Sequence, residues 1–199
     1  MKNKIGSILL FVFLAADFCI CGSAYAGDWR FPVGLSYISG VNDVSDLYED
    51  NLDELGYITD SVDAIPVGVS FRPYYEFDNG LGIGMDFGPS MLIIGDVDFF
   101  NFPVNATCRY TINHDADVAP YIRVGISHNF ASGDYVESGE TGLFAAVGLE
   151  MMRNKVVALG IEAAYDSSEI EFERYVLYWD VVYEKIKPGG FTLTFSVIF

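Results

Sequence analysis

The feature that most constrains the fold of this chain is a strict alternation of apolar with polar or small residues, which returns in eight segments. A period of two is the period of a β-strand, because successive side chains point to opposite faces. Alternating segments of roughly ten residues are typical of strands that cross a membrane in a β-barrel. The segments are 29–37, 65–77, 81–93, 102–112, 118–126, 143–151, 157–165 and 191–199.

The charged residues of these segments all fall on one face. The apolar face contains no Asp, Glu, Lys or Arg in any segment. A charge facing lipid costs roughly 2–4 kcal/mol at mid-bilayer, so this absence is expected if the apolar face meets lipid. The opposite face would line a narrow lumen, where charges need partners. We expect a structural network of four cations and four anions there: Arg30, Arg72, Arg109, Arg123, Glu76, Asp86, Glu150 and Glu162.

The links between segments alternate in length. Three links are short and rich in turn-forming residues, namely 78–80, 113–117 and 153–155. Four links are longer, namely 41–63, 94–101, 131–142 and 166–190. Short turns at one end and longer loops at the other are typical of membrane barrels, and closing the sheet leaves no unpaired edge. The sequence therefore predicts an all-β fold, an eight-stranded antiparallel up-and-down transmembrane β-barrel.

The first 26 residues have the pattern of a cleavable signal peptide. Lys2 and Lys4 precede an apolar stretch over 8–16, which is too short to span a bilayer as a helix. The small-x-small pattern of a cleavage site follows at 24–26. We expect cleavage near Ala26 and a single barrel domain over residues 27–199.

The composition excludes some functions. The chain has 28 acidic and 11 basic residues and a formal net charge of −17, which argues against binding nucleic acid. Its mean hydropathy is nevertheless positive, as expected if half of each strand faces lipid. Cys108 is the one cysteine beyond the signal peptide, so no internal disulfide is expected.

Two of the longer links are predicted to form secondary structure of their own. The link over 41–63 is rich in Asp and Glu, has no Lys or Arg, and carries apolar residues at helical spacing from Val44 to Leu55. It predicts an amphipathic helix at the barrel mouth, with Asp43 as its cap. The carboxylates could capture a divalent cation or a basic partner, or simply form a solvated face. The link over 166–190 predicts a hairpin that extends the last two strands.

No residue set satisfies the requirements of a catalytic, cofactor or metal site. Ser127, His128 and Glu137 are the residue types of a lipid-cleaving site. However, neighbours in a strand point to opposite faces, so Ser127 and His128 are badly placed for each other. The inward charges could also form an ion path, but an eight-stranded barrel is just wide enough for side chains to fill it. We therefore expect no enzyme, no cofactor and a plugged lumen.

The last segment, 191–199, alternates apolar residues and finishes on an aromatic one. It resembles the terminal strand of bacterial outer-membrane proteins, and the whole pattern is similar to that of the small OmpA-, OmpX- and OmpW-like barrels. The resemblance implies a place in the bacterial outer membrane among lipid and lipopolysaccharide. It also implies that Phe195, Val197 and Phe199 carry the signal read by the barrel-assembly machinery. No functional residue is carried over beyond this strand.

The sequence thus predicts a monomeric structural or surface-interaction barrel with acidic loops facing outward. One rival function is a conduit for small hydrophobic or ionic solutes, with a lateral gap near Pro73, Pro89 or Pro120, because proline lacks the N–H that a sheet needs. A second rival is a lipid-modifying enzyme. A rival fold, a soluble sandwich or lipocalin-like barrel, would require the charged face to be outside and the aromatic face inside.

Overall fold

The computed structural model describes residues 27–56, 66–93, 98–176 and 180–199, so the expected signal peptide lies outside the described residues. The described chain is mostly β-strand, with one α-helix. In chain order the elements are β1 (Gly27–Arg30), β2 (Pro32–Ile38), α2 (Val41–Glu54), β3 (Val67–Phe71), β4 (Tyr74–Phe77), β5 (Leu81–Phe87), β6 (Met91–Ile93), β7 (Phe99–Thr111), β8 (Val118–Gly133), β9 (Val136–Gly139), β10 (Thr141–Met151), β11 (Ala158–Asp166), β12 (Ile170–Val176), β13 (Asp180–Ile186) and β14 (Gly190–Ile198).

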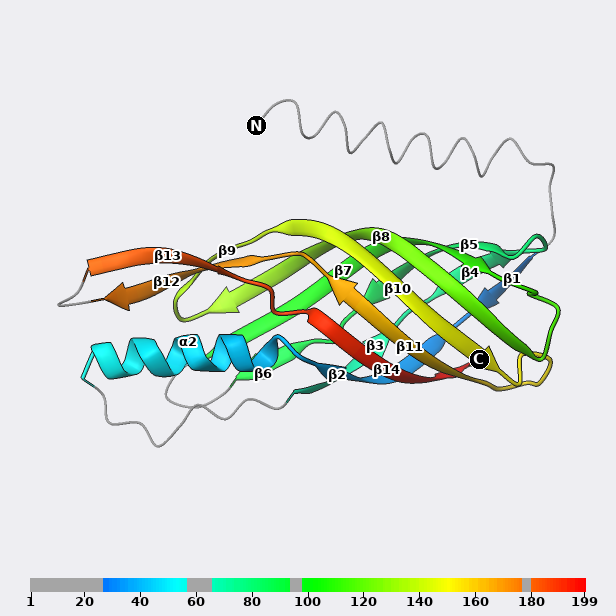
Figure 1. The fold of residues 1–199 in the computed structure, drawn as a ribbon, viewed down its shortest axis with the longest axis horizontal. Helices are drawn as coiled ribbons and strands as arrows, with labels where there is room; N and C mark the ends of the chain where they lie inside the picture. Colours follow the sequence, from blue (N-terminus) through cyan, green and yellow to red (C-terminus); the bar gives the residue numbers. More distant parts are fainter. Residues whose placement is uncertain (1–26, 57–65, 94–97, 177–179) are drawn as a thin grey trace, which may run out of the picture.

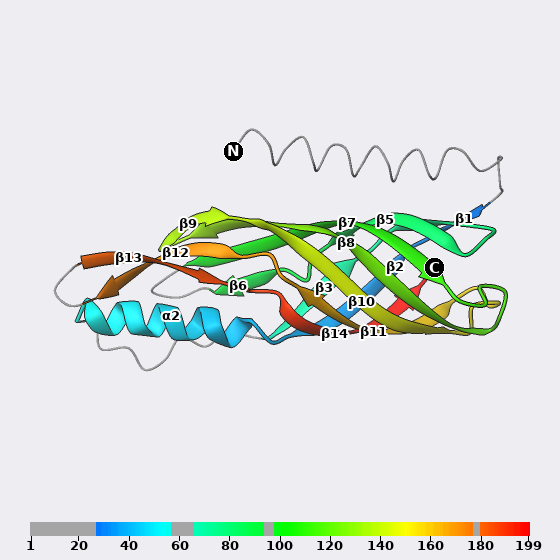
Figure 2. The ribbon, with the colours of Figure 1, turned by 45° about the horizontal axis from the view of Figure 1, so that its top comes forward.

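The strands form a closed antiparallel barrel of eight strands, as predicted (Figures 1 and 2). Each of the first three predicted strands is divided into two consecutive elements: β1 and β2, β3 and β4, and β5 and β6. The barrel closes where β2 pairs with β14, with Val33 opposite Val197. At the same joint the Phe31 N–H donates to the Phe199 carbonyl at 3.0 Å.

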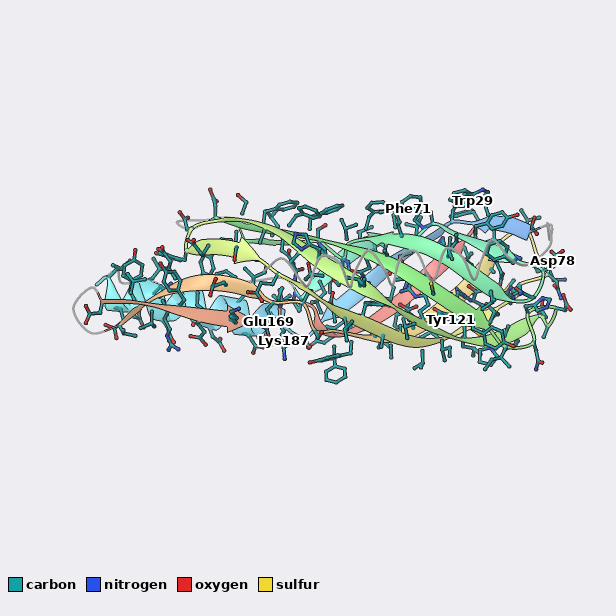
Figure 3. The ribbon with its side chains drawn as sticks, turned by 90° about the horizontal axis from the view of Figure 1, so that it is seen from above. Trp29, Phe71, Asp78, Tyr121, Glu169 and Lys187 are labelled. Carbon is teal, nitrogen blue, oxygen red and sulfur yellow. The ribbon has the colours of Figure 1, made fainter. Side chains whose placement is uncertain are left out.

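The apolar face of the strands is outside. In β2 the exposed fractions are 42% for Val33, 59% for Leu35 and 50% for Tyr37, while Gly34 and Ser36 between them are buried. The ladder of β10 and β11 repeats this alternation. Figure 3 shows side chains projecting outward along the whole barrel wall. An apolar surface of this extent matches lipid, and it excludes the rival fold with the aromatic face as its core.

The two ends of the barrel differ. At one end, called the turn end here, lie the short turns at 78–80, 112–117 and 152–157, together with β1 and the end of β14 (Figure 1). The other end, called the loop end, carries α2 and a separate sheet in the order β13-β12-β9. The predicted hairpin is β12 paired with β13, and its tip at 177–179 lies outside the described residues.

The helix α2 covers the loop-end sheet with its apolar side. Val44 and Tyr48 are fully buried, and the ring of Tyr48 lies 6.2 Å from that of Phe172 in β12. Its N-cap is Gly40, which makes no side-chain capping bond, so the expected cap at Asp43 is wrong. Asp43 lies in the first turn instead, where its charge interacts favourably with the helix dipole. Among the described residues, no helix is both long and apolar enough to cross a membrane.

Three of the predicted strands are interrupted, at Phe31, at Arg72 and Pro73, and at 88–90. The last break leaves a weak joint. Phe71 opposite Phe87 is the single register pair between β3 and β5 among the described residues, whereas β5 and β7 pair over seven positions. We call this joint the β3–β5 seam. The alternation of segment 81–93 continues through Pro89 and predicts that it faces lipid, but the turn at Gly88 (φ 85°) brings it against an internal cavity.

Candidate functional site

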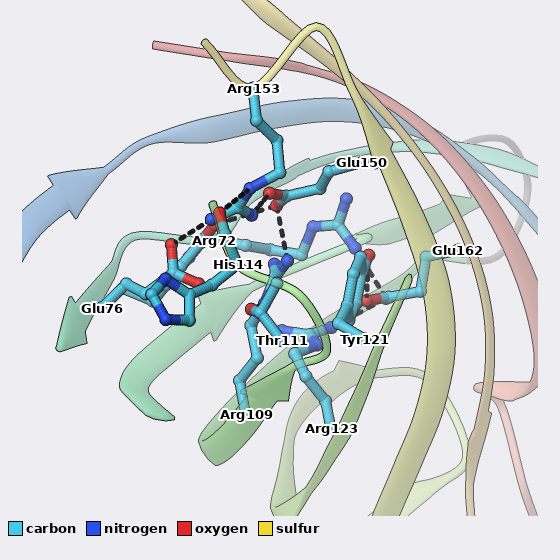
Figure 4. A network of polar contacts seen from close by, with 11 residues as sticks. Arg72, Glu76, Arg109, Thr111, His114, Tyr121, Arg123, Glu150, Arg153 and Glu162 are labelled. Carbon is cyan, nitrogen blue, oxygen red and sulfur yellow. Dashed lines mark hydrogen bonds and ion pairs between the residues drawn. The ribbon is translucent and has the colours of Figure 1, made fainter. Parts of the chain in front are cut away.

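The lumen contains two layers of ion pairs (Figure 4). The mid-barrel layer consists of Arg72, Asp86, Arg123 and Glu162. The Arg123 guanidinium lies 2.6 Å from Asp86 Oδ1 and 2.8 Å from Glu162 Oε1. Arg72 Nη1 lies 2.6 Å from the same Glu162 oxygen. Because these residues come from strands around the barrel, the chain of charges runs across the lumen.

The turn-end layer consists of Glu76, Arg109, Glu150 and Arg153. Arg109 Nη2 lies 2.7 Å from Glu150 Oε1, and Arg153 Nη2 lies 2.6 Å from Glu76 Oε2. Arg153 also pairs with Glu150. Every side chain in these pairs is at most 7% exposed. Breaking one such pair typically costs about 3–5 kcal/mol, because the remaining charge is left buried.

Arg153 is the network member that the sequence reasoning missed. It lies in the predicted short turn 153–155, but its side chain turns back into the barrel and is 4% exposed. Its Nε–H also donates to the His114 carbonyl at 3.2 Å, which joins two turns. The signal that could have found it is the spacing, because Arg153 follows Glu150 by three positions at the strand end.

Arg30 lies apart from these layers. It is half-buried in β1, and no ion pair is found for it in the described part of the chain. Seven of the eight predicted residues are therefore brought together by the structure. The cation that pairs with Glu76 is Arg153, which was not among the predicted residues.

Two tyrosines also reach into the lumen and contact the ion-pair network. The Tyr74 hydroxyl donates to Glu150 Oε1 at 2.8 Å, although β4 and β10 lie on opposite sides of the ring of strands. The Tyr121 hydroxyl donates to Glu162 Oε2 at 2.9 Å. The guanidinium of Arg109 stacks between the two rings, 4.5 Å from the centre of Tyr74 and 3.6 Å from that of Tyr121. Side chains thus meet across the full width of the barrel.

The need for buried carboxylates beside the lumen arginines has a local cause. Arg109 and Arg123 lie directly opposite each other on β7 and β8, a like-charge pairing that destabilises a sheet. Each therefore needs its own carboxylate from another strand: Glu150 for Arg109, and Asp86 with Glu162 for Arg123. Only four acidic residues of this strongly acidic chain belong to the network, and many of the others lie at the loop end.

The cavities found in the lumen among the described residues are small. One cavity of about 30 Å³ adjoins the mid-barrel layer, and a second of about 10 Å³ lies between the layers. Ligand pockets are usually about 300–1,000 Å³. These cavities are of the size of a few water molecules rather than of a solute.

The candidate lipid-cleaving residues do not meet. Ser127 is fully buried and its hydroxyl donates to Asp166 Oδ2 at 2.6 Å. His128 lies on the outer face of β8, with Nδ1 3.0 Å from Thr141 Oγ1. Glu137 is exposed on β9, in the separate loop-end sheet. No group of three or more potential metal ligands is found among the residues that the structure describes.

The comparison with protein families decides the identity of the fold. The model of the outer membrane protein beta-barrel domain matches residues 11–199. The chain belongs to the outer-membrane β-barrel family. Its location is therefore the bacterial outer membrane, and its apolar outer face is the surface that meets lipid.

Solved structures support the barrel fold at low sequence identity. OprG from Pseudomonas aeruginosa is 11% identical, with a TM-score of 0.56 over 88% of this chain and 97% of that chain. The E. coli outer membrane protein W is 13% identical, with a TM-score of 0.51 over 88% and 98% of the two chains. No curated protein matches this barrel. At these identities the likeness concerns the fold alone.

Proposed function

We propose that this barrel is a structural and surface-interaction protein of the outer membrane, with a plugged lumen and an acidic loop end. The contact between Tyr74 and Glu150 across the full width of the ring carries the proposal. This contact and the two ion-pair layers together obstruct the lumen, so a solute would have to break several buried pairs to pass. The barrel is the stable support, and α2 with the loop-end sheet forms the surface that contacts partners.

Planar-bilayer recording tests the plug. The mature chain, residues 27–199, is expected to give no steady open steps, whereas a sixteen-stranded porin inserted in the same bilayer gives them. Steady steps from folded, heat-modifiable protein would refute the plugged lumen.

The acidic surface is tested with cells and charged supports. Asp43, Asp46 and Asp53 are exposed on α2, which has no basic residue. Cells that display the protein are expected to adhere to a polylysine-coated surface, and the triple variant D43N/D46N/D53N is expected to adhere less. The matched control is D78N/D115N/D117N, which removes the same charge at the turn end. Equal adhesion of both variants would argue against a role for the helix.

The same proposal includes the partners. The barrel is monomeric, lies among lipid and lipopolysaccharide, and is assembled by the barrel-assembly machinery through β14. Phe195, Val197 and Phe199 are 59%, 38% and 59% exposed, so their side chains are accessible to an assembly factor. Deleting Phe199 should lower the amount of assembled barrel in cells while leaving refolding in detergent intact. An unchanged amount in cells would remove this assignment.

The second candidate function is a lateral conduit, and the β3–β5 seam favours it. The seam lies beside Gly88 and Pro89, which line the 30 Å³ cavity, so a small opening there would join the lumen to the lipid phase. A row of stacked rings flanks the seam on the outer surface, with Phe71 and Phe87 6.4 Å apart. Pro89 is thus the one of the three prolines at which this proposal locates the gap.

The conduit is tested by locking the seam. Ser70 and Ser90 both lie near Gly88, so S70C and S90C, in a C108A background, place one cysteine on each side of the seam, and mass spectrometry shows whether they form the disulfide. If the seam conducts, uptake of an apolar fluorescent solute into liposomes falls on oxidation and returns on reduction. The single-cysteine variants are the controls. No uptake by the wild-type protein would discard the conduit.

A further inference from the structure

The 30 Å³ cavity lies on the loop-end side of the mid-barrel layer. Arg72 and Arg123 form part of its wall, and Asn101 and Asp166 form part of the wall nearer the loop end. The ion pairs of the lumen leave this space unfilled. It is therefore an internal feature that a plug of side chains alone does not explain.

Five residues that line this cavity each have a buried polar atom with no hydrogen-bond partner among the described residues, and two of the five, Arg72 and Arg123, also line the 10 Å³ cavity. The atoms are Ser70 Oγ, Arg72 Nε, Asn101 Oδ1, Asn105 Oδ1 and Arg123 Nε. None of these residues is more than 6% exposed. Buried polar groups in native proteins are nearly always paired with protein or ordered water, so five of them around one cavity indicate a common ligand.

The chemistry of these atoms identifies the ligand class. The two Nε–H groups can only donate, the two amide oxygens can only accept, and the Ser70 hydroxyl can do either. An anion would leave the amide oxygens unpaired, and a cation would be repelled by both guanidinium groups. The wall also carries one more carboxylate than guanidinium groups, which further disfavours an anion. Water satisfies both kinds of atom.

The volume agrees with this assignment. A buried water needs roughly 10–15 Å³ of such space and about three hydrogen bonds. The cavity therefore holds about two waters, which five protein atoms and the neighbouring carboxylates can anchor.

We propose that this cavity is a binding site for about two ordered water molecules. They accept from the Nε–H groups of Arg72 and Arg123 and donate to the side-chain oxygens of Asn101 and Asn105. The waters thereby hold both guanidinium groups in the orientation that their carboxylates require, so the plug is a hydrated network rather than a dry one.

Nuclear magnetic resonance of the refolded protein in detergent tests the proposal. The Nε–H groups of Arg72 and Arg123 should show cross-peaks to water. The Nε–H of Arg109 should show none, because it donates to Thr111 Oγ1 at 3.1 Å. A missing cross-peak at Arg72 or at Arg123, or an equally strong one at Arg109, overturns the proposal. So does a saturable shift of either signal on titration with bromide, which would indicate an anion site.

A pair of variants on β7 tests the same site. Asn105→Leu removes an acceptor and fills part of the cavity, so at least one of the two water cross-peaks should be lost. Thr107→Val removes a buried hydroxyl from the same face two residues away, outside the cavity wall, and should keep both. Unchanged cross-peaks in Asn105→Leu overturn the proposal. If that variant fails to fold, the comparison of Arg109 with Arg72 and Arg123 decides alone.

Discussion

At the scale of single residues, the lumen shows how a turn residue can become part of a buried network. Arg153 belongs to the turn between β10 and β11, yet its side chain closes the turn end of the lumen. It pairs with carboxylates from two strands and bonds to the carbonyl of a third segment. One residue therefore joins parts of the chain that are far apart in sequence.

Replacing Arg153 by Ala should destabilise the barrel by about 3–5 kcal/mol, because Glu76 and Glu150 would remain buried with incomplete pairing. Urea unfolding of the refolded protein in detergent measures this. The matched control is Lys155→Ala in the same turn, where the side chain is exposed, with an expected change of about 0.5 kcal/mol or less. Similar losses in both variants would contradict the role of Arg153.

Tyr48 gives the loop end a dependence on alkaline pH. Burial, followed by the nearby charge of Asp134, raises the pKa of its phenol well above the ordinary value of 10.0. Below about pH 10, the ordinary pKa, the phenol is protonated in both the folded and the unfolded state. Above it the unfolded state releases the proton and the folded state keeps it, so stability falls as pH rises, by up to about 1.4 kcal/mol per pH unit.

Hydrogen exchange of α2 between pH 9 and pH 11 measures this effect, with those two values set around the ordinary pKa of about 10. Tyr48→Phe should have a flatter pH profile. Its stability at pH 9 should be lower by about 1 kcal/mol, because the hydrogen bond to the Asp134 carbonyl is lost. Equal slopes in the two proteins would show that Tyr48 is not the responsible group.

At the scale of elements, α2 is attached to β12 by one amide as well as by its apolar side. The Asn51 side chain donates to the Glu173 carbonyl and accepts from the Tyr175 N–H, both at 2.8 Å. It thus pairs with β12 beyond Phe172, where the pairing of β12 with β9 ends, in the way that a backbone group would. This fixes the register of the helix on the sheet.

Asn51→Ala should therefore loosen the loop end without opening the barrel. Two backbone groups of β12 would lose their partners, at a cost of about 1–3 kcal/mol each where they stay buried. Limited proteolysis should cut the loop end of this variant faster, while its heat-modifiability stays that of the wild type. Asp53→Ala, an exposed change on the same helix, is the control. Unchanged proteolysis of Asn51→Ala would show that the two Asn51 hydrogen bonds do not hold α2 on β12.

The elements also differ in how far the sequence predicts them. The eight strands and their faces follow from alternation, since lipid allows no charge on one face. The helix follows from its apolar spacing, but its cap does not, because Gly40 begins the helix without a side-chain bond. The break at 88–90 could not be predicted from alternation, which continues through it. The pairing of each Arg with its carboxylate could not be predicted from the sequence either, because the partners lie across the lumen and not along the chain.

At the scale of the whole molecule, the barrel depends on one joint between its first and last strands. β2 pairs with β14 over seven positions, from Ile38 opposite Thr192 to Pro32 opposite Ile198. Closing this joint is what leaves no strand edge exposed to lipid, where an unpaired backbone group costs several kcal/mol. The compact form should therefore appear or disappear as a unit.

Electrophoresis of the refolded chain, with and without boiling, measures that closure directly. The wild type should migrate as a compact form that boiling converts to an extended one. Leu35→Pro places a residue without an N–H in the middle of β2, opposite Phe195, and should abolish the compact form. Leu35→Ala removes an exposed side chain at the same position and should keep it. A compact form that survives Leu35→Pro would mean that the β2–β14 joint does not hold the barrel closed, and closure would have to be attributed to the lumen ion pairs instead.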